Sequence, residues 1–458
     1  MTSIATGDAA GTPAANPVAQ TQKNGGPRAL LHRIHVVAGI LVAPLLVIAA
    51  ITGVAYALAP SIEKVVYHEE LTATSSLPAQ PLEKQVEVAQ RVHPDLPVTA
   101  VQVPEKPGQT TRVMFNDEQL KSESYRHAVF VDPGDLSIKG DLVQYGSSAA
   151  LPLRAWISEG HRRLWIDSNF GRLYSETAAS WMGALAIGGL WLWWDRSRRK
   201  RTQGTSKRAH HMRRHANVGV AVSVGLLFLT VTGLTWSWVA GTGIAKLRET
   251  MDWYAPKPAI TATAPANYDW SEADSVMNLA RAEGLSGKVE LTPPEAGTVW
   301  MAKEAREEWR MGIETVTVDG STGAMVDRIH FADWPLPAKL TEWLINAHMG
   351  ILFGWVNQLV LALIGVALLA MIVRGYAMWF GRGRGGRPGR LPAPTRWRDI
   401  RPGVAAAVVA LLIAYSVVAP LFGVTLVGFV IVDWVWRKLR RGCLLYTSDA
   451  ADDSLRVD

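Results

Sequence analysis

Five long stretches of the 458-residue chain carry almost no charge, and these stretches most constrain its fold. A helix of about 20 apolar residues spans the hydrocarbon core of a bilayer, which is roughly 30 Å thick. The first stretch is long enough to cross in this way, so the sequence predicts a multi-pass membrane protein. Many of the 19 tryptophans lie at the ends of the stretches, as expected for an interfacial aromatic belt. The stretches are residues 36–59, 177–194, 216–239, 354–378 and 403–436.

Basic residues beside the apolar stretches predict their orientation. Residues 195–214 contain nine Lys or Arg and one Asp, and residues 379–401 contain seven Arg and one Asp. Basic loops of this kind stay in the cytoplasm, so we expect a bacterial inner-membrane protein with a cytoplasmic N-terminus. The last stretch has basic residues at both ends and must cross an even number of times. It is expected to form a helical hairpin broken near Pro420, or a re-entrant pair.

The predicted fold is a mainly α-helical membrane protein with four core transmembrane helices and a C-terminal helical hairpin. Two polar stretches each contain a helical segment followed by three alternating apolar runs, which predicts two small α+β domains in the periplasm. The expected segments are a disordered cytoplasmic tail (1–27), a first span (28–60), a periplasmic domain (61–170), a second span (171–194), a basic loop (195–214), a third span (215–239), a second periplasmic domain (240–347), a fourth span (348–380), a second basic loop (381–401) and the hairpin (402–441).

The end of the chain is expected to be foreign to the fold. Residues 442–458 resemble the translated read-through of a sequencing adaptor, and we interpret them as an artefact of the sequence. They contain Cys443, the one cysteine of the chain. Disulfides and thiolate metal sites are therefore not expected, and a cofactor would be held by His, Met or carboxylate side chains.

The first and third apolar stretches carry the same pattern, which predicts an internal duplication. The first begins at His35 and ends at Thr52, and the third begins at His215 and ends at Thr232. The separation from His to Thr is 17 residues in both, and a glycine follows each threonine. Another glycine follows each histidine by four residues, one helical turn away on the same face, where a flat cofactor could lie.

The later part of each half repeats a second pattern. A strand-like run closes on Asp132 in the first half and on Asp319 in the second. A histidine follows 29 residues later in both cases, His161 and His348, and an apolar span comes next. Matched spacings at several independent positions support the duplication.

Topology and repeat together sort four histidines by depth. His35 and His215 fall at the cytoplasmic side, and His161 and His348 at the periplasmic side. Neutral imidazole is a common axial ligand of haem iron, and facing helices build cofactor sites. The pattern therefore predicts two b-type haems, one between His35 and His215 and one between His161 and His348. His32, one turn before His35, is an alternative ligand.

The other histidines have no partner in the repeat. We expect His210 and His211 to be solvated in the basic loop. Surface positions are expected for His68, His93, His127 and His330.

These motifs resemble the PepSY-associated transmembrane family, whose members are often called iron-regulated membrane proteins. The resemblance covers residues 28–436. It implies periplasmic PepSY-like domains, bis-histidine haem b and reduction of ferric-siderophore iron, with haem iron held by His35, His161, His215 and His348. The motifs are His35-x3-Gly39 with Thr52-Gly53, Val129-Phe-Val-Asp132-Pro133, Gly160-His161-Arg162-Arg163-Leu164, Gly171-Arg172-Leu173, Trp191–Trp194, His348-Met-Gly350, Phe353-Gly354 and Gly375-Tyr-Ala-Met-Trp379.

One segment departs from the pattern of that family. The first domain has Asp132-Pro133-Gly134-Asp135 in place of the Asp-x-x-Thr-Gly turn, which the second domain keeps at Asp319–Gly323. The departure leaves the shape of the first turn open, but it does not touch the four histidines.

The sequence contains no dinucleotide-binding fingerprint. Gly381-Arg-Gly-Arg-Gly-Gly is a basic loop without the strand and helix of such a site. We therefore expect a quinol or a cytoplasmic flavoprotein as electron donor, and the family resemblance implies a ferric siderophore as acceptor. Two other functions remain open: a non-catalytic PepSY membrane module that binds or restrains a peptidase, and a component of siderophore transport.

Overall fold

The computed structural model describes residues 26–198, 205–261, 268–383, 389, 391–392 and 400–452. The predicted cytoplasmic tail falls almost wholly outside these residues, as does part of each predicted basic loop.

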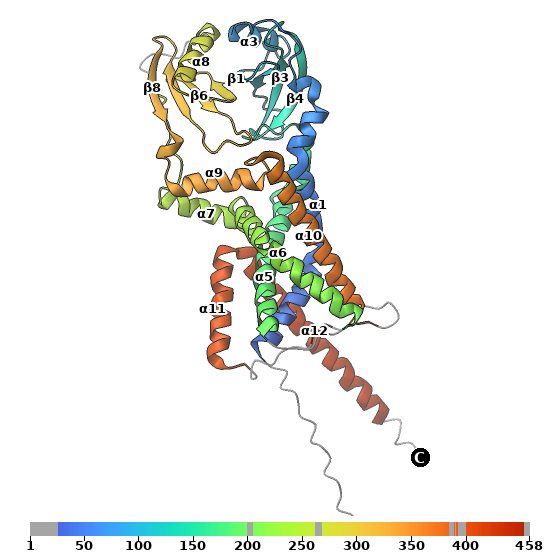
Figure 1. Ribbon diagram of the computed structural model, residues 1–458. Coiled ribbons are helices and arrows are strands. Elements are labelled where there is room, and N and C mark those ends of the chain that lie inside the picture. Colours follow the sequence, from blue (N-terminus) through green and yellow to red (C-terminus); the bar gives the residue numbers. More distant parts are fainter. Residues whose placement is uncertain are drawn as a thin grey trace, which may run out of the picture.

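The molecule has two parts, a β-sheet domain at one end and a bundle of long helices at the other (Figure 1). Four long helices, α1, α5, α6 and α10, pack in a ring in which each contacts the next. The helices are α1 (Pro27–Val66), α2 (His68–Leu71), α3 (Leu82–Gln90), α4 (Pro152–Arg163), α5 (Asn169–Arg198), α6 (Lys207–Thr235), α7 (Val239–Thr250), α8 (Ala273–Ala282), α9 (Leu336–His348), α10 (Gly354–Phe380), α11 (Pro402–Val418) and α12 (Pro420–Asp452), with 3-10 turns at Trp270–Glu272 and Phe331–Asp333.

Three of the described helices, α1, α6 and α10, are long and apolar enough to cross a membrane. They support the prediction of a multi-pass membrane protein. The remaining core span was predicted at residues 177–194, which lie inside α5, but α5 is not among these three. Glycine, serine, threonine and tryptophan dilute its aliphatic residues. It is still 30 residues long and packs between α1 and α6.

The two C-terminal helices meet at Pro420, so the predicted break is confirmed. Proline lacks the backbone N–H that a helix interior needs. Two hydrogen bonds attach this helix pair to α5. The Trp181 indole donates to the Thr425 hydroxyl at 2.8 Å, and the Tyr415 hydroxyl donates to the carbonyl of Ser180 at 2.6 Å. The pair therefore packs on the outside of the ring.

The β-sheet domain is built on one eight-stranded antiparallel sheet, in the order β4-β3-β2-β1-β5-β6-β7-β8. The two halves of the chain contribute four strands each, and they join where Val101 of β1 lies opposite Leu291 of β5. The prediction of two separate small domains missed this pairing and the outer strands β4 and β8, few of whose residues are buried. The strands are β1 (Val98–Val103), β2 (Thr111–Phe115), β3 (Tyr125–Val131), β4 (Ile138–Tyr145), β5 (Val289–Thr292), β6 (Trp300–Glu304), β7 (Thr315–Asp319) and β8 (Ala324–Ile329).

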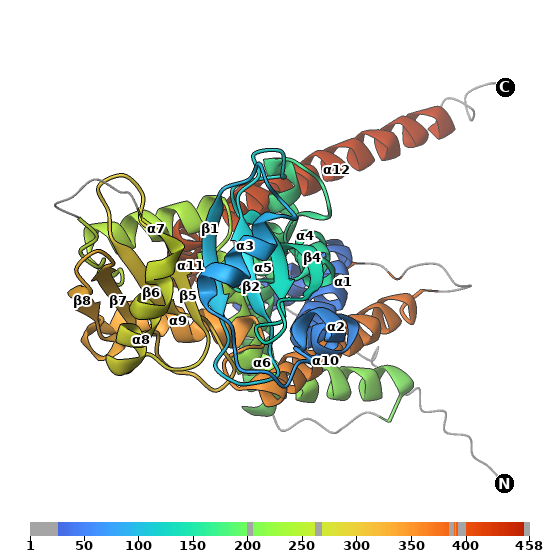
Figure 2. The ribbon, with the colours of Figure 1, turned by 90° about the horizontal axis from the view of Figure 1, so that it is seen from above.

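A single hydrophobic core runs beneath both halves of the sheet. Val86 and Ala89 of α3 pack into it from one half, and Val276 and Ala280 of α8 from the other. The largest side chain in this core is the fully buried Trp300. Figures 1 and 2 show α3 and α8 at the end of the sheet domain farthest from the bundle. The two halves therefore form one body.

The turns after β3 and β7 have the same form despite their different sequences. In the second turn Gly323 has a left-handed backbone (φ +67°), and its N–H donates to the Asp319 carbonyl at 2.8 Å. In the first turn Leu136 takes that place (φ +62°) and donates to the Asp132 carbonyl at 3.0 Å. The departure from the Asp-x-x-Thr-Gly pattern therefore leaves the turn intact, although a left-handed non-glycine residue costs about 1–2 kcal/mol.

The buried carboxylate of Asp132 stabilises this first turn. The backbone N–H groups of Thr74, Ser75 and Gly134 donate to it at 2.6–3.0 Å. Burial opposes ionisation, but these hydrogen bonds outweigh it and hold the pKa of Asp132 below its ordinary value. Asp132 thus attaches the segment between α2 and α3 to the end of β3.

Shorter helices connect the sheet domain to the bundle. In Figure 1, α7 and α9 cross beneath the sheet domain, and α4 packs against α1, α5 and β4. The buried carboxylate of Glu176 on α5 accepts from the N–H groups of Val239 and Ala240 at 2.8 and 2.9 Å, at the positive end of the α7 dipole. His161 lies in the last turn of α4 and His348 ends α9, so these helices bring both histidines to the end of the ring.

Candidate functional site

Two cavities lie inside the ring of α1, α5, α6 and α10. One contains His35 and His215 and has a volume of about 720 Å³; we call it the His35/His215 cavity. The other contains His161 and His348 and has a volume of about 530 Å³; we call it the His161/His348 cavity. Both volumes fall in the range of about 300–1,000 Å³ that is typical of ligand and cofactor sites. Each cavity therefore contains one pair of the histidines that the sequence singled out.

Four apolar side chains form a partition between the two cavities, because each of them lines both. Every helix of the ring supplies one of the four. The cavities are therefore neighbours along the bundle, separated by about one layer of side chains. The partition consists of Leu46 on α1, Met182 on α5, Leu226 on α6 and Leu368 on α10.

The rings of His35 and His215 face the same small space. Their centroids are 6.3 Å apart, and their planes make an angle of 89°. Two imidazoles that share one metal at about 2 Å each would have their nitrogens about 4 Å apart, with the ring centres farther back. The observed spacing leaves room for one metal ion between the two rings.

The Nδ1 atoms of His215 and His35 lie in different surroundings. His215 donates from Nδ1 to the carbonyl of Met371 on α10 at 3.0 Å, which leaves its Nε2 with a free lone pair. The buried Nδ1 of His35 forms no hydrogen bond with the described residues. A hydrogen bond from one ring nitrogen to a backbone carbonyl, as in His215, fixes the tautomer and orientation of metal-ligating histidines.

Each histidine of the His161/His348 cavity contacts a threonine from a long helix. The Thr52 hydroxyl lies 3.0 Å from Nδ1 of His161, and the Thr232 hydroxyl lies 2.6 Å from Nδ1 of His348. Each threonine donates its own proton to the carbonyl oxygen four residues earlier in its helix, at 2.7 Å. The hydroxyl oxygen must then accept from the imidazole, so Nδ1 carries the proton and Nε2 keeps a free lone pair. Nε2 is therefore the nitrogen with the free lone pair in both imidazoles.

Glycines make room for the imidazoles. A Cβ at Gly53 would lie 3.2 Å from Cε1 of His161, and one at Gly189 would lie 3.2 Å from Cε1 of His35. Gly39 and Gly219, the glycines one turn after the histidines, both line the His35/His215 cavity. A Cβ at Gly39 would meet no atom within 4 Å. The space above Gly39 is therefore open, whereas a Cβ at Gly219 would lie 3.1 Å from Cε of Met371.

Arginines line both cavities, although the rest of each wall is largely apolar. Arg306 is held by Glu342, with hydrogen bonds of 2.6 and 2.8 Å, and Arg162 bonds to Glu159 at 2.9 Å. The His161/His348 cavity is lined by Arg162, Arg172 and Arg306, and the His35/His215 cavity by Arg28, Arg196, Arg208 and Arg382.

A model of the PepSY-associated TM region matches residues 32–382, which is about three quarters of the chain. The chain belongs to this family. The comparison with curated proteins found no match. The matched PepSY-associated region contains all four paired histidines and the whole lining of both cavities except Gly26, Arg28 and Ala29, and it ends before the C-terminal helix pair.

Part of this site was predicted from the sequence. The structure brings His35 together with His215 and His161 together with His348, which is the pairing that the repeat predicted; their role as ligands stays a prediction. His32 also lines the His35/His215 cavity, so it stays an alternative. Neither His210 nor His211 is among the residues that line a cavity. The role of the two threonines was missed, although their matched spacing was already a signal.

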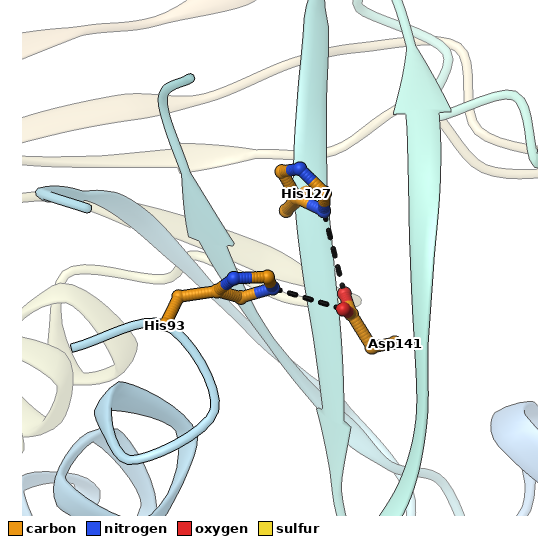
Figure 3. Close-up of side chains that lie close together, drawn as sticks. All are labelled: His93, His127 and Asp141. Carbon is orange, nitrogen blue, oxygen red and sulfur yellow. Dashed lines mark hydrogen bonds and ion pairs between the residues drawn. The ribbon is translucent and has the colours of Figure 1, made fainter. Parts of the chain in front are cut away.

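The sheet domain of this PepSY-associated chain contains two further polar clusters. His93, His127 and Asp141 lie together on the first half (Figure 3). The side chains of His93 and His127 are 17% and 19% exposed, so these residues are partly buried at the surface of the sheet domain. The expectation of a surface position holds better for His68, which is exposed, and for His330, whose side chain is 45% exposed.

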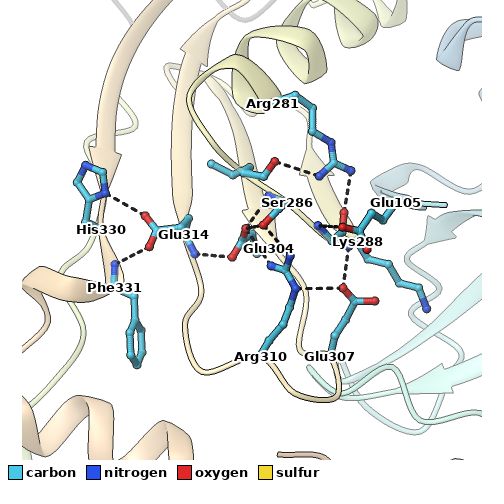
Figure 4. A network of polar contacts seen from close by, with 12 residues as sticks. Glu105, Arg281, Ser286, Lys288, Glu304, Glu307, Arg310, Glu314, His330 and Phe331 are labelled. Carbon is cyan, nitrogen blue, oxygen red and sulfur yellow. Dashed lines mark hydrogen bonds and ion pairs between the residues drawn. The ribbon is translucent and has the colours of Figure 1, made fainter.

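The second cluster links the two halves of the sheet (Figure 4). Glu105, in the loop after β1, accepts from the N–H of Gly287 ahead of β5 at 3.1 Å. Nearby, Glu304 pairs with Arg310 at 3.0 Å. Burial, reinforced by the charge of a nearby arginine, lowers the pKa of Lys288 to about 8. Because these groups satisfy one another across the β1–β5 junction, we interpret the cluster as structural.

Proposed function

We propose that this protein binds two b-type haems and passes electrons across a bacterial inner membrane to ferric siderophore iron. His35 and His215 would hold one haem, and His161 and His348 the other. The observation that carries the proposal is the coincidence of two cavities with two histidine pairs, because either feature alone occurs in many structural cores. Bound haem b supplies a one-electron redox centre at each site.

The residues present fit this cofactor. Each cavity has two imidazoles, and in three of the four the hydrogen bond at Nδ1 leaves Nε2 available to iron. The open wall at Gly39 suits a flat macrocycle. Haem b carries two carboxylates, and the arginines of each cavity are the natural partners for them. Arg172 is a good candidate, since no ion pair is formed by it among the described residues.

The partition suits electron transfer between the two sites. Because Leu46, Met182, Leu226 and Leu368 line both cavities, groups bound in the two cavities would lie one side-chain layer apart. Apolar side chains also keep water and protons out of the path. Two sites at successive depths divide the membrane into shorter jumps than a single site would.

The sheet domain is the proposed place for the acceptor. Tyr145 and Ser147, at and just after the end of β4, line the His161/His348 cavity together with Arg306. A ferric chelate too large to cross the bilayer could approach this cavity from the sheet side. One electron converts its Fe(III) to Fe(II), which oxygen-rich chelators hold less well.

The proposal also includes the orientation of the protein in the membrane and the evolutionary origin of its sheet domain. The basic loops support a cytoplasmic N-terminus and a periplasmic sheet domain. The two sheet halves, each with one helix and four strands, support an origin by duplication of a PepSY-like unit. The electron donor would be a quinol or a cytoplasmic flavoprotein that reaches the His35/His215 side.

A haem count on the purified protein tests this proposal. We expect a reduced-minus-oxidised spectrum of low-spin haem b and about two haems per chain in the pyridine haemochrome assay, because there are two bis-histidine sites. A colourless, correctly folded preparation from haem-replete cells would contradict the proposal. It would favour a PepSY module that binds a peptidase, or a transport component, in which the histidines are structural.

A further inference from the structure

A compact cluster of nitrogen and oxygen donors lies on the sheet domain, outside both cavities. His93 Nε2 is 2.9 Å from Asp141 Oδ2, and His127 Nδ1 is 3.6 Å from Asp141 Oδ1. One donor atom from each residue lies within 4.8 Å of the other two. The two imidazole centroids are 4.5 Å apart. Figure 3 shows both rings directed at the same carboxylate.

Three separate elements bring the cluster together. His127 lies on β3 and Asp141 on β4, and the register of these strands places both side chains on the face covered by α3. His93 comes from the loop that follows α3. The Gln90 side chain holds this loop by donating to the carbonyls of His93 and Leu96, at 2.6 and 2.9 Å. The rings therefore have a defined place.

A second carboxylate orients His127. Asp117 Oδ2 lies 3.3 Å from Nε2 of His127, on the side of the ring away from Asp141. A neutral imidazole has one N–H and can donate to only one of these carboxylates. Donation to Asp117 leaves the Nδ1 lone pair facing an oxygen of Asp141. A shared cation turns this repulsive contact into an attractive one, and a carboxylate behind a metal-ligating histidine is a recurring arrangement.

We propose that His93, His127 and Asp141 bind one divalent transition-metal ion, with Asp117 as the outer partner that fixes the ring of His127. Two imidazoles and one carboxylate, with water completing the shell, suit Zn²⁺ and its first-row neighbours. Mg²⁺ and Ca²⁺ are disfavoured, because they take oxygen ligands almost entirely. The metal would fasten the loop after α3 to the outer strands of the sheet.

The metal site does not depend on the proposed haem function. Asp141 precedes Tyr145, which lines the His161/His348 cavity, by four residues along β4. At about 3.3 Å per residue, Asp141 lies about 13 Å along the strand from Tyr145 at the edge of that cavity. The thermal-unfolding midpoint of the metal-free protein, and haem content where haem is bound, can therefore serve as checks that a variant has folded.

The test is Zn²⁺ binding to the full-length, tag-free protein after treatment with a chelator, followed by calorimetry. We expect one equivalent of Zn²⁺ per chain, and an X-ray absorption spectrum with imidazole nitrogens at about 2.0–2.1 Å. His93→Ala, His127→Ala and Asp141→Ala should each weaken binding by at least about 100-fold. Asp117→Asn should weaken it by about 10–100-fold, which is the usual effect of losing an outer partner.

Matched controls separate this site from other imidazoles. His330→Ala removes a histidine of the second half that pairs with Glu314 at 3.1 Å, and it should leave Zn²⁺ binding unchanged. All variants should keep the haem content of the wild type. Wild-type protein that binds no Zn²⁺ would overturn the proposal, and so would binding that survives His93→Ala combined with His127→Ala.

Discussion

Alanine in place of His35 or His215 is expected to remove one haem and to leave the other bound. A methyl group cannot bind haem iron as the proposed imidazole ligand would, and the His161/His348 cavity contains a histidine pair of its own. His161→Ala and His348→Ala should remove the other haem. The haem count should therefore fall from about two to about one per chain in each variant, and the missing spectral component should differ between the two pairs. Low-temperature difference spectra and potentiometric titration measure this.

The control for these substitutions is His68→Ala, because His68 is exposed and lies outside both cavities. It should keep both haems. If His35→Ala and His161→Ala removed the same component, the pairing by cavity would be wrong. A His35→Ala protein with both haems would identify His32, which lines the same cavity, as the ligand.

Thr52→Val and Thr232→Val are expected to loosen the haem of the His161/His348 cavity without abolishing its binding. Valine has nearly the shape of threonine but cannot accept from Nδ1 of the imidazole. A buried N–H left without a partner costs about 1–3 kcal/mol, and loss of such outer partners lowers metal affinity by about 10–100-fold. Haem transfer to a haem-free globin scavenger should accelerate by a comparable factor for this haem alone.

A matched control for the threonine variants lies in the same helix. Thr235 also donates to the carbonyl four residues earlier, at 2.8 Å, but it is only partly buried and forms no hydrogen bond with a paired histidine among the described residues. Thr235→Val should release haem at the wild-type rate. Equal rates for Thr232→Val and Thr235→Val would show that the contact between Thr232 and His348 does not hold the ligand.

The histidine pairs could be predicted from the sequence because helices convert spacing into depth. When two transmembrane helices run in the same direction, an equal number of residues between His and Thr places the matching residues at the same depth in the membrane. The same spacing could not reveal that Thr52 reaches His161, since that contact depends on where α4 ends. Secondary structure was predicted well where apolar residues recur at the regular spacing of a helix or a strand. It was predicted poorly for β4 and β8, in which exposed faces weaken the alternation of apolar residues.

The joined sheet and the cluster of His93, His127 and Asp141 could not be predicted from the sequence, for a different reason. The pairing of Val101 with Leu291 links segments far apart in the chain, and no local pattern specifies it. His93 lies in a loop, and its distance in sequence from His127 and Asp141 follows no metal-binding motif. The turn at Leu136 kept its form because Asp132 receives three backbone hydrogen bonds, although the usual glycine is missing.

The central claim is that electrons cross the membrane through this chain, and sealed vesicles containing the purified protein test it most directly. Dithionite is trapped inside, the external dithionite is removed, and a ferric siderophore is added outside with ferrozine to trap Fe(II). We predict that Fe(II) forms outside vesicles that contain the wild-type protein. It should not form outside protein-free vesicles or vesicles that contain the His35→Ala or His161→Ala variant. If wild-type vesicles held two reducible haems but formed no more external Fe(II) than protein-free vesicles, the claim of transmembrane electron transfer to ferric iron would be contradicted.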